Sequence, residues 1–177
     1  MLLALLGAAA AMVSGDGLTQ PLTPGTITVA PATGAALPPE AGRAFDEAVQ
    51  RAALRAGFTL LPGQDHGRYS AQVTVTRTSR GVVASGRAAT PPPLAGLGGS
   101  VSLSLPAGGA RYSELAVTQL TVTIARRSDG RAVWSGSAVT ARASDTPSGS
   151  VDAVAQRLAD AVLSQFPGQA DGPVSVP

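Results

Sequence analysis

Residues 115–142, LAVTQLTVTIARRSDGRAVWSGSAVTAR, decide the fold because they spell a long β-hairpin. In the first arm, large apolar side chains alternate with polar ones, at Leu120, Val122 and Ile124. A two-residue Asp-Gly loop would place Ile124 opposite Ser135. A three-residue loop, with Gly130 in the left-handed conformation, places Ile124 opposite Trp134. Only the second register gathers the large apolar groups on one face, so we predict that register.

The spacing of apolar residues outside the hairpin predicts the remaining elements. In chain order they are a strand at 26–30, a helix at 38–57, a strand at 58–61, strands at 69–77 and 82–88 joined by a turn at 79–81, a short strand at 100–105, and, after the hairpin, a helix at 150–166. This order, β-α-β-β-β-(loop with short β)-β-β-α, predicts a two-layer α+β domain. We expect a mostly antiparallel β-sheet with both helices packed on one face.

The chain of 177 residues divides into one domain and its flanking segments. We expect a secretory signal peptide at 1–15, a linker at 16–25, a single α+β domain at 26–168 and a tail at 169–177. Within the domain, residues 89–109 form an excursion rich in glycine and proline.

The N-terminal segment predicts export. Residues 2–13 are continuously apolar, too short to span a bilayer and without a polar helical face. Asp16 stands where a lipoprotein would carry its lipidated cysteine, so this sequence has no acylation site there. We expect a periplasmic or outer-membrane-associated protein with no transmembrane segment in the mature chain. The alternative is a buried N-terminal helix or strand of a cytosolic protein.

The composition excludes several kinds of chemistry. The chain has no cysteine, which rules out disulfides, thiolate metal sites and cysteine nucleophiles, and its only histidine is His66. All 13 basic residues are arginine, and the net charge is +2. No arginine stripe is interleaved with aromatic residues, so we expect no nucleic-acid partner. His66 lies in a loop beside Asp65, where no nucleophile is at a known spacing, and we expect it to be solvated. We predict no catalytic residue, cofactor or metal site.

Two segments are candidate interaction surfaces. Arg126, Arg127 and Arg131 crowd the tip of the hairpin, where they could meet an anionic envelope component or an acidic envelope protein. A solvated tip is the alternative, and so it is for a second basic turn with Arg77, Arg80 and Arg87. In the excursion, a candidate edge strand could accept a strand from another chain, although a variable loop explains the same residues: Val101, Leu103 and Leu105.

Residues 129–136, DGRAVWSG, resemble the closing hairpin of a bacterial cell-envelope family known as a domain of unknown function. Its members are typically lipoproteins with a glycine-rich excursion before that hairpin, here 89–109. They also have a final amphipathic helix that ends in Phe-Pro-Gly, here 158–168. The strand at 69–75 and the alanine-rich helix and Gly-Phe entry at 51–58 are similar too. The resemblance implies an exported envelope protein and carries over no functional residue.

Three functions follow from these observations. The first is a non-enzymatic envelope domain that binds other envelope components. The second is a carrier that holds a small apolar ligand between sheet and helices, which requires an internal cavity of several hundred cubic ångströms. The third is a carboxylate-type hydrolase, which requires two acidic residues to converge in a pocket, out of Asp65, Glu114, Asp129 and Asp145.

Overall fold

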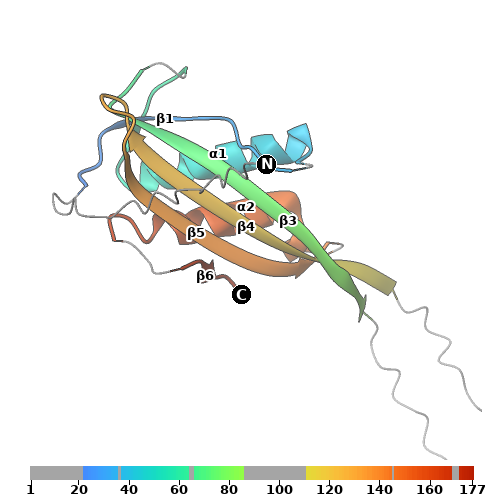
Figure 1. The fold of residues 1–177 in the computed structure, drawn as a ribbon. Helices are drawn as coiled ribbons and strands as arrows, with labels where there is room; N and C mark the ends of the chain where they lie inside the picture. Colours follow the sequence, from blue (N-terminus) through green and yellow to red (C-terminus); the bar gives the residue numbers. More distant parts are fainter. Residues whose placement is uncertain (1–21, 36, 64–65, 86–110, 145, 169–171) are drawn as a thin grey trace, which may run out of the picture.

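The computed structural model describes residues 22–35, 37–63, 66–85, 111–144, 146–168 and 172–177. The described elements form two layers, a sheet with both helices packed on one of its faces, as predicted (Figure 1). In chain order they are β1 (Thr26–Val29), α1 (Pro39–Arg55), β2 (Thr59–Leu60), β3 (Tyr69–Ser85), β4 (Arg111–Arg126), β5 (Ala132–Ala143), the short 3-10 helix η1 (Pro147–Gly149), α2 (Val151–Leu163) and β6 (Val174–Ser175).

The sheet is mixed, with strand order β2-β1-β3-β4-β5-β6. Its centre is the antiparallel meander of β3, β4 and β5, which are its longest strands. The short strands at both edges pair in parallel: β1 with β2 and β3, and β6 with β5. The segment expected to be a tail therefore contributes a two-residue edge strand. None of the described helices is long and apolar enough to cross a membrane.

The hairpin has the predicted register, with Ile124 opposite Trp134 and Leu120 opposite Ala138. Next to the turn the pairing shifts by one residue, with Ala125 opposite Ala132 and the Arg126 N–H donating to the Arg131 carbonyl, so the loop has four residues (127–130) and not the predicted three. Gly130 has the predicted left-handed conformation, with a φ of +67°. Trp134 is buried, and its indole Nε1 donates a hydrogen bond of 2.7 Å to the carbonyl of Gly168, past the end of α2. The tryptophan thereby ties the hairpin to the chain that follows the second helix.

The prediction of a turn at 79–81 is wrong. β3 is one continuous strand through this segment, and its register against β4 shifts between Ser79 and Val82. Gly81, with a φ of +113°, lies within this irregularity. A β-bulge thus uses the glycine conformation that the sequence had suggested for a turn, and the strand bends without reversing.

Both helices begin where the sequence indicates. α1 starts at Pro39, and its C-terminus closes in a Schellman motif: Phe58 N–H donates to the Ala53 carbonyl (3.0 Å) and Gly57 N–H to that of Leu54 (3.1 Å). α2 is capped by Ser150, whose hydroxyl accepts from the Ala153 N–H.

One hydrophobic core fills the space between the helices and the inner face of the sheet. Alternate residues of β3 and β4 enter it, as the period of two predicts. The outer face of β3 is exposed and polar at Gln72, Thr74 and Thr76. The largest fully buried side chains are those of Trp134, Tyr69, Ile27, Leu120, Ile124 and Leu158.

The distal ends of β3 and β4 extend beyond the helices as a two-stranded arm (Figure 1). Its residues pair with each other at Val82 and Glu114, among other positions. Val82 is 69% exposed, the most exposed large apolar residue of the described chain. The sheet therefore has two different ends, the hairpin tip with Gly130 at one and the arm at the other.

Candidate functional site

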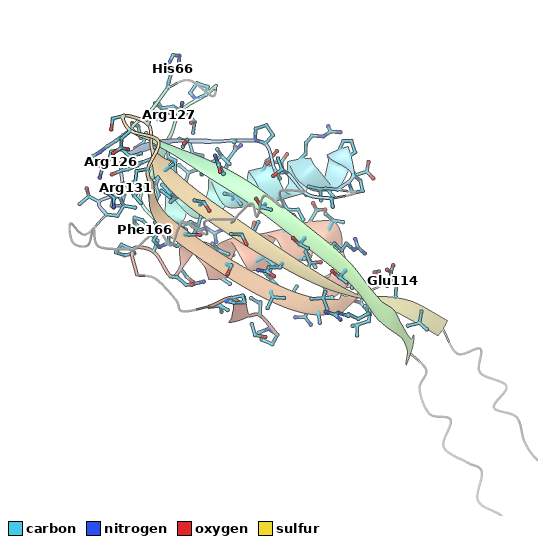
Figure 2. All side chains as sticks on the ribbon, viewed as in Figure 1. His66, Glu114, Arg126, Arg127, Arg131 and Phe166 are labelled. Atoms are coloured by element: carbon cyan, nitrogen blue, oxygen red, sulfur yellow. The ribbon has the colours of Figure 1, made fainter. Side chains whose placement is uncertain are left out.

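Four arginines lie together at the hairpin end of the sheet, and we call them the four-arginine tip: Arg68, Arg126, Arg127 and Arg131 (Figure 2). The antiparallel pairing of β3 with β4 produces this cluster. It places Tyr69, the first residue of β3, opposite Arg126, the last residue of β4. Arg68 therefore lies beside the hairpin turn, where its carbonyl accepts a 3.1 Å hydrogen bond from the Arg127 N–H.

One described carboxylate lies among these guanidinium groups. Asp129 Oδ2 accepts from Arg126 Nη1 at 3.3 Å, and its Oδ1 accepts from the backbone N–H of Arg131 at 3.1 Å. The Arg126 and Asp129 side chains are 43% and 44% exposed, so water competes with this ion pair. Asp129 therefore shapes the turn and offsets one of the positive charges at the tip.

The other two arginines of the tip are fixed by neighbouring strands. Arg127 is half-buried, and its Nη2 donates to the Thr28 hydroxyl on β1. The Arg68 guanidinium lies 5.3 Å from the centroid of the Tyr69 ring, within the range of a cation–π contact. A hollow lies between the two turns that carry Arg68 and Arg127. The tip therefore combines exposed arginines with Arg127, whose guanidinium is hydrogen-bonded to β1.

Sequence reasoning found three members of this tip, Arg126, Arg127 and Arg131, and missed Arg68. Arg68 immediately precedes the strand predicted at 69–77. If that strand had been predicted to pair with the first arm of the hairpin, Arg68 would have been expected beside the hairpin turn. The exposed His66 is at the same end of the molecule (Figure 2). The other candidate interaction residues, Val101, Leu103 and Leu105, lie outside the described residues.

The acidic residues that a hydrolase would need are far apart where they are described. Asp129 pairs with Arg126 at the tip, and Glu114 lies at the opposite end of the sheet (Figure 2). Asp65 and Asp145 lie outside the described residues. Within the described part of the chain, no group of three His, Cys, Asp or Glu side chains could hold a metal ion.

Asp46 has a perturbed carboxyl group. It lies on α1 with its Oδ1 2.6 Å from the backbone N–H of Ala32, which donates to it. Burial raises the pKa of this carboxyl above its ordinary value of 3.8, the Ala32 hydrogen bond lowers it, and the charge of Glu47 raises it further. Asp46 fixes the loop between β1 and α1 and contacts neither the tip nor the cavity described next.

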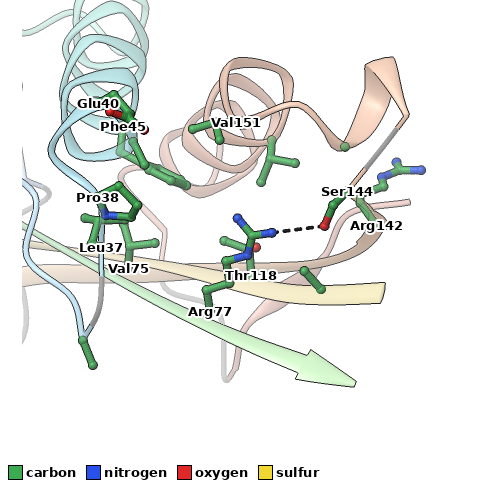
Figure 3. Close-up of a pocket in the computed structure, with 15 residues that line it drawn as sticks. Leu37, Pro38, Glu40, Phe45, Val75, Arg77, Thr118, Arg142, Ser144 and Val151 are labelled. Atoms are coloured by element: carbon green, nitrogen blue, oxygen red, sulfur yellow. Dashed lines mark hydrogen bonds between the residues drawn. The ribbon is translucent and has the colours of Figure 1, made fainter. Parts of the chain in front are cut away.

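A cavity of about 270 Å³ lies between the sheet and the N-terminal ends of both helices (Figure 3). The cavity lies where the carrier hypothesis requires it, between sheet and helices. Its volume is smaller than the several hundred cubic ångströms which that hypothesis expects. Arg77, assigned by the sequence to a basic turn, reaches into its mouth and donates a 3.1 Å hydrogen bond to Ser144. The apolar lining includes Leu37, Phe45, Val75, Val151 and Val154.

No protein-family model matches this sequence, and no curated protein matches it. The chain is distantly similar to two structures of the PelC dodecamer from Paraburkholderia phytofirmans, one of them a single-substitution variant. The variant aligns at a TM-score of 0.46 and 17% identity over 78% of this chain and 82% of its own. The other aligns at 0.46 and 15%, over 78% and 84%. A likeness at this level indicates neither family nor function, and the resemblance of residues 129–136 to an envelope family stays a prediction.

Proposed function

We propose that this chain is an exported, non-enzymatic domain of the bacterial cell envelope that binds anionic envelope components at its four-arginine tip. The observation that carries the proposal is that two adjacent turns bring four arginines to one end of the sheet, with Asp129 the one described carboxylate bonded among them. Export is supported by the apolar segment at 2–13 and by the sequence resemblance of residues 129–136.

Phosphate-bearing lipid headgroups are the component that best suits this tip. A guanidinium group presents a planar fork of donors that binds phosphate oxygens in pairs. Each basic residue near an anionic membrane surface contributes about 1 kcal/mol at low salt. The three arginines that the variant below changes carry three positive charges, and Asp129 offsets one of them, so we expect an attraction of about 2 kcal/mol, a factor on the order of thirty in partition.

Vesicle binding tests the proposal. The full chain is mixed with vesicles of phosphatidylglycerol and phosphatidylcholine, or of phosphatidylcholine alone, and the bound fraction is measured by flotation at low and high salt. One triple variant removes charge from the tip, and Arg127 is kept because it bonds to Thr28: Arg68→Gln, Arg126→Gln and Arg131→Gln. The matched variant removes the same charge from exposed positions elsewhere: Arg43→Gln, Arg80→Gln and Arg157→Gln.

We expect wild type and the matched variant to bind anionic vesicles, and both to release them at high salt because the attraction is screened. The tip variant should lose most of its binding. Equal loss in both variants would mean that net charge, and not the tip, governs binding. Absence of binding by wild type would overturn the lipid assignment and leave an acidic envelope protein as the partner to test.

A further inference from the structure

We propose that the cavity between the helix N-termini and the sheet is a binding site for a small amphipathic carboxylate, such as a short fatty acid, whose head group pairs with Arg77. This site shares no residue with the hollow at the four-arginine tip, and it includes Arg142 near the far end of β5 from that tip. Its ligand is also chemically different. The proposal therefore goes beyond the function proposed for the tip, and either can fail without the other.

The inner part of the cavity is apolar and belongs to the core wall. Phe45 from α1, Val154 from α2 and Val75 from β3 line it, at 3%, 7% and 2% exposure. Ala41 and Ala116 add small side chains at 6% each. A lining of this kind favours a hydrocarbon chain over water.

The mouth of the cavity is cationic. Arg77 points from β3 toward Ser144, and its guanidinium bonds to that hydroxyl (Figure 3). Arg142 lines the same cavity, and its Nε is buried without a hydrogen-bond partner among the described residues. Across the described chain, neither arginine makes an ion pair, although the exposed Glu40 lies at the rim. Arg77 therefore has a neutral acceptor but no anionic partner among the described residues, and an anionic head group would supply one.

The helix ends strengthen this preference for an anion. No side chain caps the N-terminus of α1, whose first-turn residues Glu40 and Ala41 line the cavity. Gly149 of η1 and Val151, the first residue of α2, line it from the other side, where Ser150 already caps the helix. Unpaired N–H groups and the positive end of the helix dipole attract negative charge. The side chain of Glu40 occupies part of this field, so we expect a ligand head group at the mouth beside Arg77, with its apolar tail directed inward.

The volume limits the size of the ligand. Binding sites for drug-sized molecules begin at about 300 Å³, and this cavity has about 270 Å³. At about 30 Å³ for each water-sized group, it holds a molecule of about nine or ten non-hydrogen atoms. Octanoate has this size, carries one carboxylate and has an unbranched apolar tail, so it is a suitable probe.

The test compares octanoate with octan-1-ol and octylamine, which have the same tail and a neutral or cationic head. Each is titrated into the full wild-type chain, and the site is located by amide shifts in two-dimensional NMR. Arg77→Gln removes the guanidinium. Arg80→Gln, an exposed residue of the same strand that does not line the cavity, is the matched control. Ala41→Leu fills the apolar part and leaves both arginines in place.

We expect octanoate to shift the amides of Phe45, Val75 and Val154 and to bind at least about tenfold more tightly than octan-1-ol, with octylamine weaker still. Arg77→Gln should abolish this difference between octanoate and octan-1-ol, Ala41→Leu should weaken both ligands, and Arg80→Gln should change neither. Equal binding of octanoate and octan-1-ol by wild type would overturn the proposal, a result that needs no variant to fold. Shifts confined to the four-arginine tip would overturn it as well.

Discussion

At the scale of single residues, the W-x-G spacing of the second hairpin arm has a steric reason. Trp134 and Gly136 lie on the same face of β5, and the indole ring folds over the glycine. A Cβ at Gly136 would lie 2.6 Å and 2.8 Å from two ring carbons of Trp134 and 3.3 Å from Val162. Only glycine leaves room for the ring at the position where Nε1 reaches the Gly168 carbonyl.

Gly136→Ala should therefore destabilise the domain by about 1–3 kcal/mol, because the buried ring must move against a packed core. Urea unfolding followed by circular dichroism measures the change in the free energy of unfolding. Gly172→Ala, where a Cβ meets nothing within 4 Å, serves as the control and should be close to neutral. An unchanged midpoint for Gly136→Ala would mean that the indole does not pack over this position.

Asp46 gives a prediction on pH. Its pKa is raised in the folded state, chiefly by burial, so the folded protein binds this proton more tightly than the unfolded chain. The resulting stabilisation is fully present below pH 3.8 and is lost as the pH rises through the folded-state pKa. Asp46→Asn keeps an oxygen acceptor for the Ala32 N–H and removes the titration.

The stability of Asp46→Asn relative to wild type should therefore increase between pH 3.5 and pH 7. Thermal unfolding of both proteins across this range measures the difference. Asp152→Asn, an exposed acidic residue on the other helix, is the control for loss of a negative charge. A relative stability that falls with rising pH would show that the Ala32 hydrogen bond, and not burial, dominates the carboxyl group.

At the scale of the elements, the sequence predicted those features that a few neighbouring residues determine. The apolar alternation of β4, Gly130 in the turn and the proline start of α1 each specify their element from a few neighbouring residues. Two features depended on the rest of the molecule. Gly81 suits a turn and a bulge equally, and the pairing of β3 with β4 on both sides of it decides for the bulge. The two residues of β6 form a strand only because β5 offers an edge.

Gly81→Ala tests the bulge. A Cβ there meets nothing within 4 Å, so the cost comes from the positive φ alone, about 1–2 kcal/mol. Because the arm pairs mainly with itself beyond this position, the strain should act locally. We expect faster hydrogen exchange at Val82 and Glu114, with the exchange of core amides such as Leu120 unchanged. Faster exchange in the core would contradict a locally held arm.

At the scale of the whole molecule, the sequence predicted three of the four arginines of the tip, and it offered a cavity between sheet and helices only as an alternative, without naming its lining. Arg126, Arg127 and Arg131 are close in the chain, so their clustering needed no tertiary information. Arg68 joins them only through the pairing of β3 with β4. The cavity brings together residues from six elements, α1, β3, β4, β5, η1 and α2, and no local sequence pattern predicts such a convergence. Arg77 in particular was assigned to a turn that the structure replaces with a continuous strand.

The proposed function requires that the chain leaves the cytoplasm, and the intact mass of the protein from fractionated cells tests this most directly. We predict recovery from the envelope fraction, with a mass that lacks about the first 15 residues, because residues 2–13 have the length and apolarity of a signal peptide. Replacing Leu5 and Leu6 with arginine should keep the protein uncleaved and in the cytoplasm. A wild-type protein found in the cytoplasm with Met1 still attached would contradict an envelope function.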